Sequence, residues 1–293
     1  MEEKHKTVMF EEVIEHLNIK KNGTYVDCTF GDGGHSKGIA QKLQKGKIIA
    51  FDWDETNIDK IKNDLFFMNK KFIFINDNFS NFSYNLEKIL IKKVDGVLLD
   101  LGISSNQLFS DRGFSYRLDN KLDMRISKKH QKITAEKIIN DFSQKELSDI
   151  FYYYGEEKKS RKIAKKICYY RKKERIIKTQ KLVSLIASCF SKKKNKHPAK
   201  KIFQALRIFI NKELENISNC LKEVVDKLKK GGRILVISFH SLEDRIIKKN
   251  FKNFEKTKKF KIINKKPLTP SDLEIKKNNR SRSSKMRIIE KIL

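Results

Sequence analysis

The stretch Thr24-Tyr-Val-Asp-Cys-Thr-Phe-Gly-Asp-Gly-Gly-His-Ser36 joins a short apolar run to a glycine-rich turn and then to a helical pattern. The apolar run predicts a buried strand, and the pattern over 36–44 predicts a helix. Glycines let the backbone of such a turn approach a ligand closely, and the free N–H groups of the next helix attract it. The stretch predicts the first strand–helix unit of an α/β fold with a nucleotide-binding turn, although a turn that only shapes the chain has the same residues.

Short apolar runs and helical patterns alternate along the first 110 residues. Helical spacing of apolar residues predicts helices over 8–19, 36–44 and 56–67. A strand–helix series of this kind predicts a parallel sheet with helices on both faces, and right-handed crossovers favour a doubly wound α/β sheet. The predicted strands are Thr24–Thr29, Lys47–Phe51, Lys71–Ile75 and Val94–Leu99.

The alternation of strands and helices stops near residue 110 and resumes near residue 203. Residues 134–191 show only helical patterns, and a capping box begins one of these helices at Ser143. The interruption predicts an α/β domain made of residues 1–110 and 203–293, with an all-helical domain of residues 111–202 inserted into it.

The residues after the insertion return to the pattern of the first domain. Apolar residues at every third or fourth position predict one helix over 203–228, and Gly231-Gly232 is typical of a helix end. The run Arg233–Phe239 predicts a strand, and Ser241 begins a capping pattern for a helix after it. A basic stretch without clear order separates that helix from a final strand, predicted at Lys285–Lys291.

The charge of the chain is strongly positive. Its 293 residues include 66 Lys and Arg against 36 Asp and Glu, a net charge of +30. A surplus of this size favours a polyanionic partner such as nucleic acid, because each neutralised phosphate releases a condensed counterion. A genome with biased base composition would also give a lysine-rich chain, so the charge by itself leaves both explanations open.

The cysteines and the hydropathy exclude several classes of protein. The four cysteines, Cys28, Cys168, Cys189 and Cys220, form no C-x-x-C pair, so neither a structural zinc site nor a disulfide framework is expected. No run of about 18 apolar residues suggests a membrane span, and the N-terminal residues do not resemble a secretory signal. We expect a cytoplasmic protein that has no metal and does not contact a membrane; the sequence does not indicate an oligomeric state.

An acidic residue, Asp52, follows the second predicted strand, 21 positions after Gly31. A carboxylate at that strand end accepts hydrogen bonds from ribose hydroxyl groups, and a spacing near 20 is expected for such a unit. Dinucleotide sites place a third glycine where this chain has Ser36, and Gly34 and His35 crowd the turn. The sequence therefore favours S-adenosylmethionine over a dinucleotide, and the absence of a Gly-Lys-Ser or Gly-Lys-Thr run excludes a P-loop.

A second acidic residue, Asp100, ends the fourth predicted strand. The carboxyl ends of parallel strands form the edge at which open sheets bind ligands. The lone pair of an exocyclic base amine is delocalised into the ring, and a carboxylate that holds the amine hydrogens makes this lone pair available and directs it. Asp100 is therefore a candidate for the catalytic group of an amino methyltransferase; the alternative is a residue that only caps a turn or helix.

Nine runs distributed over nearly the whole chain resemble, in order, a family of bacterial methyltransferases that act on the cytosine N4 amine of small-subunit ribosomal RNA. The most distinctive are DCTFGDGGHS (27–36) and GGRILVISFHSLEDRIIK (231–248). The others are HKTVM (5–9), LLDLGISSNQL (98–108), RGFSY (112–116), LDMR (122–125), YGEE (154–157), HPAKKIFQALRIFIN (197–211) and RSRSSKMRI (280–288). The basic segment 250–279 lacks such a likeness.

The resemblance implies a Rossmann-like class I methyltransferase domain with an inserted helical domain that has a role in RNA recognition. It implies methyl transfer from S-adenosylmethionine to the N4 amine of a decoding-region cytidine, with Asp100 as the catalytic residue and small ribosomal subunits as the expected partner. The implied cofactor-binding residues are Gly33, Gly34 and His35 in the turn, Asp52 at the ribose, Phe79 by the adenine, and Asp100 and Gln107, which flank the methionine end and the transfer site.

Other interpretations of the sequence remain open. A non-catalytic RNA-binding factor for ribosome assembly could keep the fold without the chemistry. A DNA amino methyltransferase is disfavoured because Asp100-Leu-Gly-Ile replaces its usual Asp/Asn/Ser-Pro-Pro-aromatic motif. Ser238 and His240 could lie at the edge of the substrate pocket or anchor a loop. The aromatic run 151–154 and the basic run 158–175 could bind RNA, or they could form core and solvated helix faces.

Overall fold

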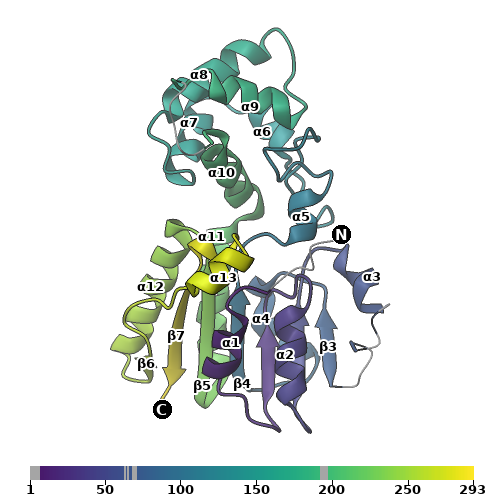
Figure 1. Cartoon of the computed structure of the whole chain (residues 1–293), viewed down its shortest axis with the longest axis vertical. Helices are drawn as coiled ribbons and strands as arrows, with labels where there is room; N and C mark the ends of the chain where they lie inside the picture. The colour runs from purple at the N-terminus through teal and green to yellow at the C-terminus, as the bar shows by residue number, and fades with distance from the viewer. Residues whose placement is uncertain (1–6, 63, 65, 68–70, 192–196) are drawn as a thin grey trace. The chain divides into compact units, whose positions relative to one another are not determined.

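The residues that the structure describes form two compact units, and a mixed sheet of seven strands lies at the centre of the larger one (Figure 1). The structure is a computed structural model and describes residues 7–62, 64, 66–67, 71–191 and 197–293. The strands are β1 (Thr24–Asp27), β2 (Lys47–Phe51), β3 (Phe72–Ile75), β4 (Val94–Asp100), β5 (Leu228–Ser238), β6 (Phe260–Ile262) and β7 (Lys285–Lys291).

The order of the strands is β3-β2-β1-β4-β5-β7-β6. The first five strands are parallel, and β7 runs antiparallel to both β5 and β6. The order changes direction between β1 and β4, which is the switch point of a doubly wound sheet. The predicted fold class, a mostly parallel Rossmann-like α/β sheet, is confirmed.

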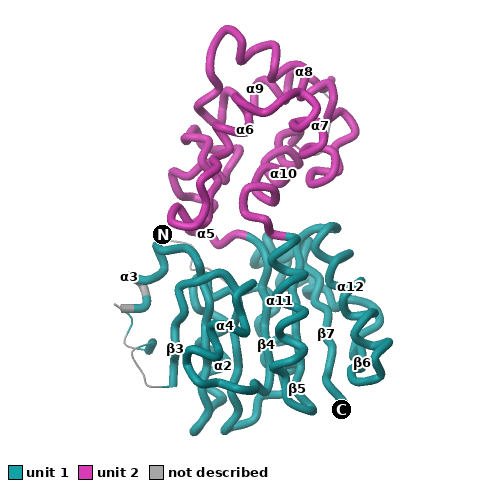
Figure 2. The backbone as a smooth tube through the Cα atoms, turned by 180° about the vertical axis from the view of Figure 1, so that it is seen from behind, with its two compact units in different colours: residues 1–102, 214–293 teal, residues 103–213 magenta. Residues whose placement is uncertain are grey.

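Alternate residues of the strands face two separate layers of helices. Tyr25 and Leu98 pack with residues of α1 and α2, whereas Val26 and Val97 pack with residues of α4, α11 and α12. Figures 1 and 2 show the helices from the two sides of the sheet. This alternation is the consequence of the two-residue period of a strand. The helices of this unit are α1 (Phe10–His16), α2 (Gly34–Lys42), α3 (Asn57–Lys62), α4 (Phe82–Lys88), α11 (Glu213–Lys227), α12 (Ser241–Lys256) and α13 (Asp272–Lys277), with the 3-10 turns η1 (Phe79–Asn81) and η2 (Ser281–Ser283).

The second unit contains only helices as regular elements among its described residues (Figure 2). They are α5 (Ser105–Phe109), α6 (Ala135–Asp141), α7 (Gln144–Tyr153), α8 (Ser160–Arg171), α9 (Thr179–Ala187) and α10 (Ala199–Asn211). The unit comprises residues 103–213, whereas the other comprises residues 1–102 and 214–293. These boundaries differ by about ten residues from those expected from the sequence, because α5 and α10 pack with the helical unit.

The prediction of a single helix over 203–228 is wrong. The structure has α10 and α11 there, separated at Lys212, which adopts a left-handed conformation with φ 50°. Arg207 and Glu213 bridge this break with two hydrogen bonds, Nε to Oε1 at 2.8 Å and Nη2 to Oε2 at 3.0 Å. Apolar spacing did not reveal the break because both helices bury residues at helical intervals.

Two further expectations near β5 need correction. Gly231-Gly232 does not end a helix, because α11 ends at Lys227 and the glycines lie within β5, where the pairing with β4 shifts register. Gly231 has φ 75°, a conformation that glycine adopts without strain. The cap of α12 is His240 and not Ser241, because the His240 Nδ1 accepts a hydrogen bond from the Glu243 N–H in place of a hydroxyl group.

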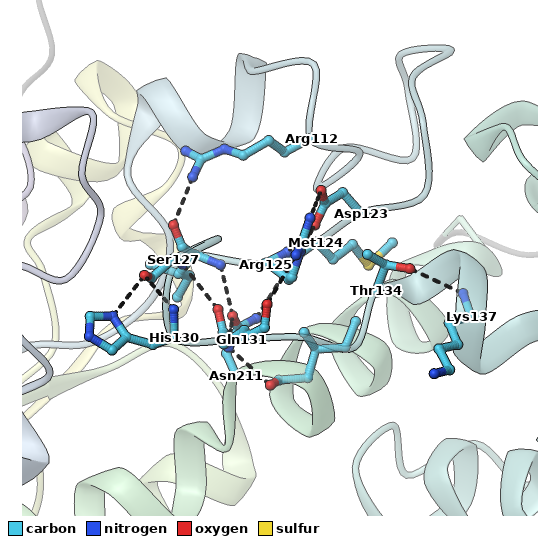
Figure 3. A network of polar contacts seen from close by, with 12 residues as sticks. Arg112, Asp123, Met124, Arg125, Ser127, His130, Gln131, Thr134, Lys137 and Asn211 are labelled. Carbon is cyan, nitrogen blue, oxygen red and sulfur yellow. Dashed lines mark hydrogen bonds and ion pairs between the residues drawn. The ribbon is translucent and has the colours of Figure 1, made fainter.

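A buried polar network holds the loop 112–131 against the end of α10 (Figure 3). Asn211 is fully buried, and its amide oxygen accepts hydrogen bonds from the Ile126 N–H at 2.9 Å and the Gln131 Nε2 at 2.7 Å. Its amide nitrogen donates to the carbonyls of Met124 and Arg207. All four hydrogen-bonding positions of the amide are therefore occupied, as burial of a polar group requires.

Candidate active site

The carboxyl ends of β1, β2 and β4 carry the residues that the sequence assigned to the cofactor loop, the ribose and the transfer site. These strands are direct neighbours in the sheet, paired in parallel (Figure 1). The glycine turn follows β1, Asp52 follows β2, and Asp100 is the last residue of β4. The topology therefore brings three predicted groups, separated by up to about 70 residues, to one edge of one sheet.

The turn between β1 and α2 is closely packed. Gly31 and Gly33 have φ values of 54° and 77°, and Gly33 is the N-cap of α2. A Cβ atom on Gly33 would lie 2.6 Å from the Phe67 ring, and one on Gly34 would lie 1.9 Å from Thr7 Oγ1. The turn thus needs glycine at these positions for its own conformation and packing.

Asp52 is tied directly to the glycine turn. Its Oδ2 accepts hydrogen bonds from the Gly31 N–H at 3.0 Å and the Asn57 Nδ2 at 2.7 Å, and its Oδ1 accepts one from the Asp54 N–H at 2.9 Å. Burial raises the pKa of Asp52 to about 7, with the charge of Asp54 adding to the effect and the three donors opposing it. The carboxyl group is oriented before any ligand binds, and it keeps acceptor capacity on Oδ1.

Asp100 is held by two residues of the adjacent turn. The Asp100 N–H donates to Thr29 Oγ1 at 2.7 Å, and the Asp100 Oδ2 lies 3.4 Å from the His35 Nε2. Its other oxygen, Oδ1, is buried and has no hydrogen-bond partner among the residues described, and neither ring nitrogen of His35 makes a hydrogen bond there, because the 3.4 Å contact of its Nε2 is an ion-pair distance only. Unsatisfied buried polar atoms are rare in proteins and require an explanation, which a polar ligand at this edge would give.

A third carboxyl group, Asp27, lies beneath this pair and is fully buried. Its Oδ2 accepts the hydroxyl hydrogen of Ser36 at 2.7 Å, and its Oδ1 accepts the Thr29 N–H at 3.1 Å. Burial raises the pKa of Asp27, and the neighbouring charge of Asp100 acts in the same direction. Asp27 therefore connects both ends of the turn. Because its side chain is fully buried, it stabilises the site and does not contact a ligand.

Segments from both ends of the chain also pack at the turn, and the sequence analysis missed these contacts. The Phe10 ring stacks over His35 with a centroid separation of 6.2 Å. The N–H of Met9, a fully buried residue, donates to the Glu274 Oε1 at 2.9 Å. Partial burial, together with the charges of Glu12 and Asp100, raises the pKa of Glu274. A pairing 265 residues apart gives no signal in local sequence.

The structure places the last two predicted cofactor residues as follows. Phe79 begins η1 after β3 and packs, partly buried, against the main hydrophobic core. Gln107 lies in α5 of the helical unit, where its side chain accepts the Ser104 N–H at 3.1 Å and completes a capping box. Both roles stabilise the local fold, and the proposed contacts of Phe79 and Gln107 with a cofactor stay predictions.

Ser238 and His240 do not form a nucleophilic pair. The Ser238 hydroxyl donates to the carbonyl of Lys285 at 3.3 Å, whereas the His240 ring caps α12 and its Nε2 lies 3.0 Å from the Glu243 Oε1. Glu243 is almost fully buried and also accepts the Phe239 N–H at 2.7 Å. These contacts favour the interpretation of Ser238 and His240 as residues that anchor the loop between β5 and α12.

The donors and acceptors at the sheet edge fit S-adenosylmethionine. Its ribose hydroxyl groups require an acceptor, and the Asp52 Oδ1, which accepts the Asp54 N–H, has capacity for one more hydrogen bond. Its carboxylate requires donors, which the start of α2 and the His35 Nδ1 can provide. The turn itself contains no lysine or arginine that could bind a phosphate group. The nearest basic residue in the sequence, Lys37 on α2, forms an ion pair with Asp64.

Comparison with known proteins gives a consistent result over the full chain. The profile of the MraW methylase family matches residues 2–292. Two relatives carry the name "Ribosomal RNA small subunit methyltransferase H". The relative from Fusobacterium nucleatum is 45% identical, with 98% of this chain and 97% of that protein covered. The relative from Mesoplasma florum is 44% identical, with 99% of each covered.

Among solved structures, a putative rRNA methylase from Clostridium thermocellum aligns with a TM-score of 0.48 at 14% sequence identity, covering 99% of this chain and 100% of that one. The family profile and the two relatives agree with the family, the methyltransferase activity and the S-adenosylmethionine cofactor that the motifs implied. The chain belongs to the MraW methylase family.

Proposed function

We propose that the protein transfers a methyl group from S-adenosylmethionine to the N4 amine of a cytidine in the decoding region of small-subunit ribosomal RNA. The names of its relatives support the class of RNA. The structural observation that carries the proposal is the state of Asp100. Thr29 accepts its backbone N–H at the ligand-binding edge, its carboxylate Oδ2 lies 3.4 Å from the His35 Nε2, and its Oδ1 has no partner within the described part of the chain.

Asp100 would act on the amine in two ways. A carboxylate that accepts the amine hydrogens withdraws the nitrogen lone pair from the ring and directs it at the methyl carbon, which is a matter of orientation. As the N–C bond forms and the S–C bond breaks, the nitrogen becomes cationic, and a carboxylate stabilises this charge and receives the proton that leaves. No metal and no covalent enzyme intermediate are needed for this direct transfer.

The other residues of the edge would bind and orient the cofactor, which supplies a methyl group activated by its sulfonium. Gly33, Gly34 and His35 would hold its methionine end at the start of α2, and Asp52 would accept the ribose hydroxyl groups. We also propose that Phe79 lies at the adenine and Gln107 at the transfer site, as in the family that the sequence resembles. These two assignments rest on that resemblance.

The helical unit is proposed to recognise the RNA, and the partner to be an assembled small subunit in the cytoplasm. A cytidine within folded ribosomal RNA has a defined position only when its surroundings are folded, and the target base must leave its stack to reach Asp100. Within the described residues no helix has the length and apolar character needed to cross a membrane.

A non-catalytic assembly factor with the same fold is the alternative. It would require neither the oriented Asp100 nor the tie between Asp52 and the glycine turn, and both are present. The Asp100 Oδ1 is a buried acceptor without a partner within the described part of the chain, which is costly without a ligand, so this atom supports the enzyme over the assembly factor.

The test is to incubate the protein with methyl-labelled S-adenosylmethionine and small subunits that lack the modification, and to identify the labelled nucleoside by mass spectrometry. We expect N4-methylcytidine at one position, and much less product with naked ribosomal RNA. Label on another atom or nucleotide would overturn the substrate, and efficient labelling of a short unfolded oligonucleotide would overturn the need for an assembled subunit. If the protein does not bind the cofactor and does not transfer label, the assembly factor is the correct interpretation.

A further inference from the structure

Helix α8 of the helical unit presents an exposed face that the proposed chemistry does not use. Its inner face is closed, because Ile163, Ala164 and Ile167 are fully buried. Its outer face consists of Arg161, Lys162, Lys165 and Lys166, all exposed, followed by Tyr169 with 63% of its surface exposed. The ring and the cations next to it form one continuous outer face of the helix.

The positive charge of the chain is not spread evenly, which bears on its origin. Residues 1–102 contain 15 Lys and Arg against 16 Asp and Glu, whereas residues 103–213 contain 29 against 11 and residues 214–293 contain 22 against 9. A compositional bias of the genome would act on the whole chain, but the surplus of basic residues is confined to the helical unit and the C-terminal part. This uneven distribution favours a polyanionic partner over compositional bias.

Within the helical unit, α8 lies in a strongly basic stretch. Residues 158–173 contain nine Lys and Arg and no Asp or Glu. Arg161 and Lys165, and likewise Lys162 and Lys166, are four positions apart on the helix, where like charges repel and are mildly destabilising. Surface helices usually offset such repulsion with an acid at the same spacing. On α8 no acid does so, and a polyanion would remove the repulsion.

The aromatic residue completes the pattern. The Lys173 Nζ lies 5.5 Å from the centre of the Tyr169 ring, so a cation lies next to an exposed aromatic face. Unpaired bases stack on such rings while neighbouring cations bind the phosphates, and this stacking tolerates any base. From Arg161 to Arg171 the helix rises about 15 Å, and Lys173 follows in the next turn, which gives a face long enough for several nucleotides of a single strand.

We propose that the α8 face, defined as Arg161, Lys162, Lys165, Lys166, Tyr169 and Lys173, binds an unpaired segment of the RNA substrate away from the transferred methyl group. The four cations of the first two turns contact phosphates, and Tyr169 stacks on a base. This inference rests on the proposed function, since it names a docking site for the same substrate. An acidic protein segment would match the cations but gives no reason for an exposed ring beside them.

The test measures binding of the full-length protein to a fluorescein-labelled single-stranded RNA of 20 nucleotides at several salt concentrations. The variant R161A/K162A/K165A/K166A should lower the slope of log affinity against log salt by about 3, because each lost phosphate contact contributes about 0.7 for a single strand. Y169L should weaken binding roughly tenfold at unchanged slope, and Y169F should bind as the wild type does because the ring remains.

The matched control is K248A/K249A/K252A/K256A on α12, which removes four exposed cations from the other basic part of the chain. We expect this variant to change the slope by less than 1. An equal loss from the α8 and α12 variants would show that binding follows net charge alone and would overturn the inference. So would equal binding of Y169L and Y169F, or equally effective competition by poly-glutamate of the same length and charge.

The same variants separate this inference from the proposed function. With small subunits as substrate, the α8 variant should raise KM several-fold while kcat and the affinity for S-adenosylmethionine stay unchanged. If the wild type methylates subunits and the α8 variant has the same KM and salt slope, the α8 face is not the docking site although the function stands. If the wild type methylates nothing, the function fails, and the salt slopes still decide whether α8 binds RNA.

Discussion

The affinity for S-adenosylmethionine should depend on pH through Asp52. Burial raises the pKa of its carboxyl group to about 7 before a ligand is bound. The ribose hydroxyl groups donate hydrogen bonds to the ionised form, so binding selects the carboxylate and lowers this pKa. The protonated fraction must lose its proton for the cofactor to bind, and affinity therefore rises as pH rises through 7.

The size of the effect follows from the pKa. At pH 6 about ten of eleven molecules carry a protonated Asp52, whereas at pH 8 about one in eleven does, so the dissociation constant should fall about tenfold between these values. In free energy this is about 1.4 kcal/mol. The effect is an upper limit that is reached when the bound carboxyl group has its ordinary pKa.

Isothermal titration calorimetry from pH 5.5 to 8.5 in buffers of different ionisation enthalpy would measure both the affinity and the protons released. D52N is the control, because it removes the titrating group but leaves the amino group of the cofactor, which titrates near pH 8. We expect weaker binding by D52N at high pH and a loss of the tenfold trend. A wild-type affinity that is constant from pH 6 to 8, or a D52N profile as steep as that of the wild type, would refute the reasoning.

Three further substitutions test the supports of the site. G34A places a Cβ 1.9 Å from Thr7 Oγ1 and should weaken cofactor binding several-fold, and T7A/G34A should recover most of this loss, as calorimetry would show. E274A removes the acceptor of the Met9 N–H and should speed amide exchange there and cost about 1 kcal/mol of stability, whereas E274Q keeps the acceptor and should not. N211A leaves buried donors unsatisfied and should lower the unfolding free energy by about 3 kcal/mol in urea titrations, while cofactor affinity is retained.

The sequence predicted most of the fold because the deciding signals are local. The strands β2 and β7 have the predicted bounds, and the capping box at Ser143 begins α7 as expected. The break at Lys212 was missed because one residue with positive φ does not disturb the apolar period on either side. The strand β6 was missed because only three residues form it, and its pairing with β7 lies far along the chain.

The candidate site shows the same division. Asp52 and Asp100 could be predicted as site residues because each follows an apolar run that predicts a strand, and the carboxyl ends of parallel strands lie at one edge of the sheet. The contact of His35 with Asp100 and that of Glu274 with Met9 join residues far apart in the sequence, and no local pattern predicts them. The capping role of Gln107 could have been found, since Ser104 and Gln107 have the spacing of a capping box.

The most direct test of the central claim compares methyl transfer and cofactor binding in D100N. Asparagine keeps the size of the side chain and the backbone N–H that donates to Thr29 Oγ1, but it loses the negative charge and one acceptor. The single-turnover rate on small subunits should fall by about 100-fold or more, the range for a group that orients an amine and accepts its proton. The affinity for S-adenosylhomocysteine should fall far less, by about tenfold at most. A D100N rate within a few-fold of the wild type, with the product still N4-methylcytidine, would contradict the account and reduce Asp100 to a structural residue at the end of β4.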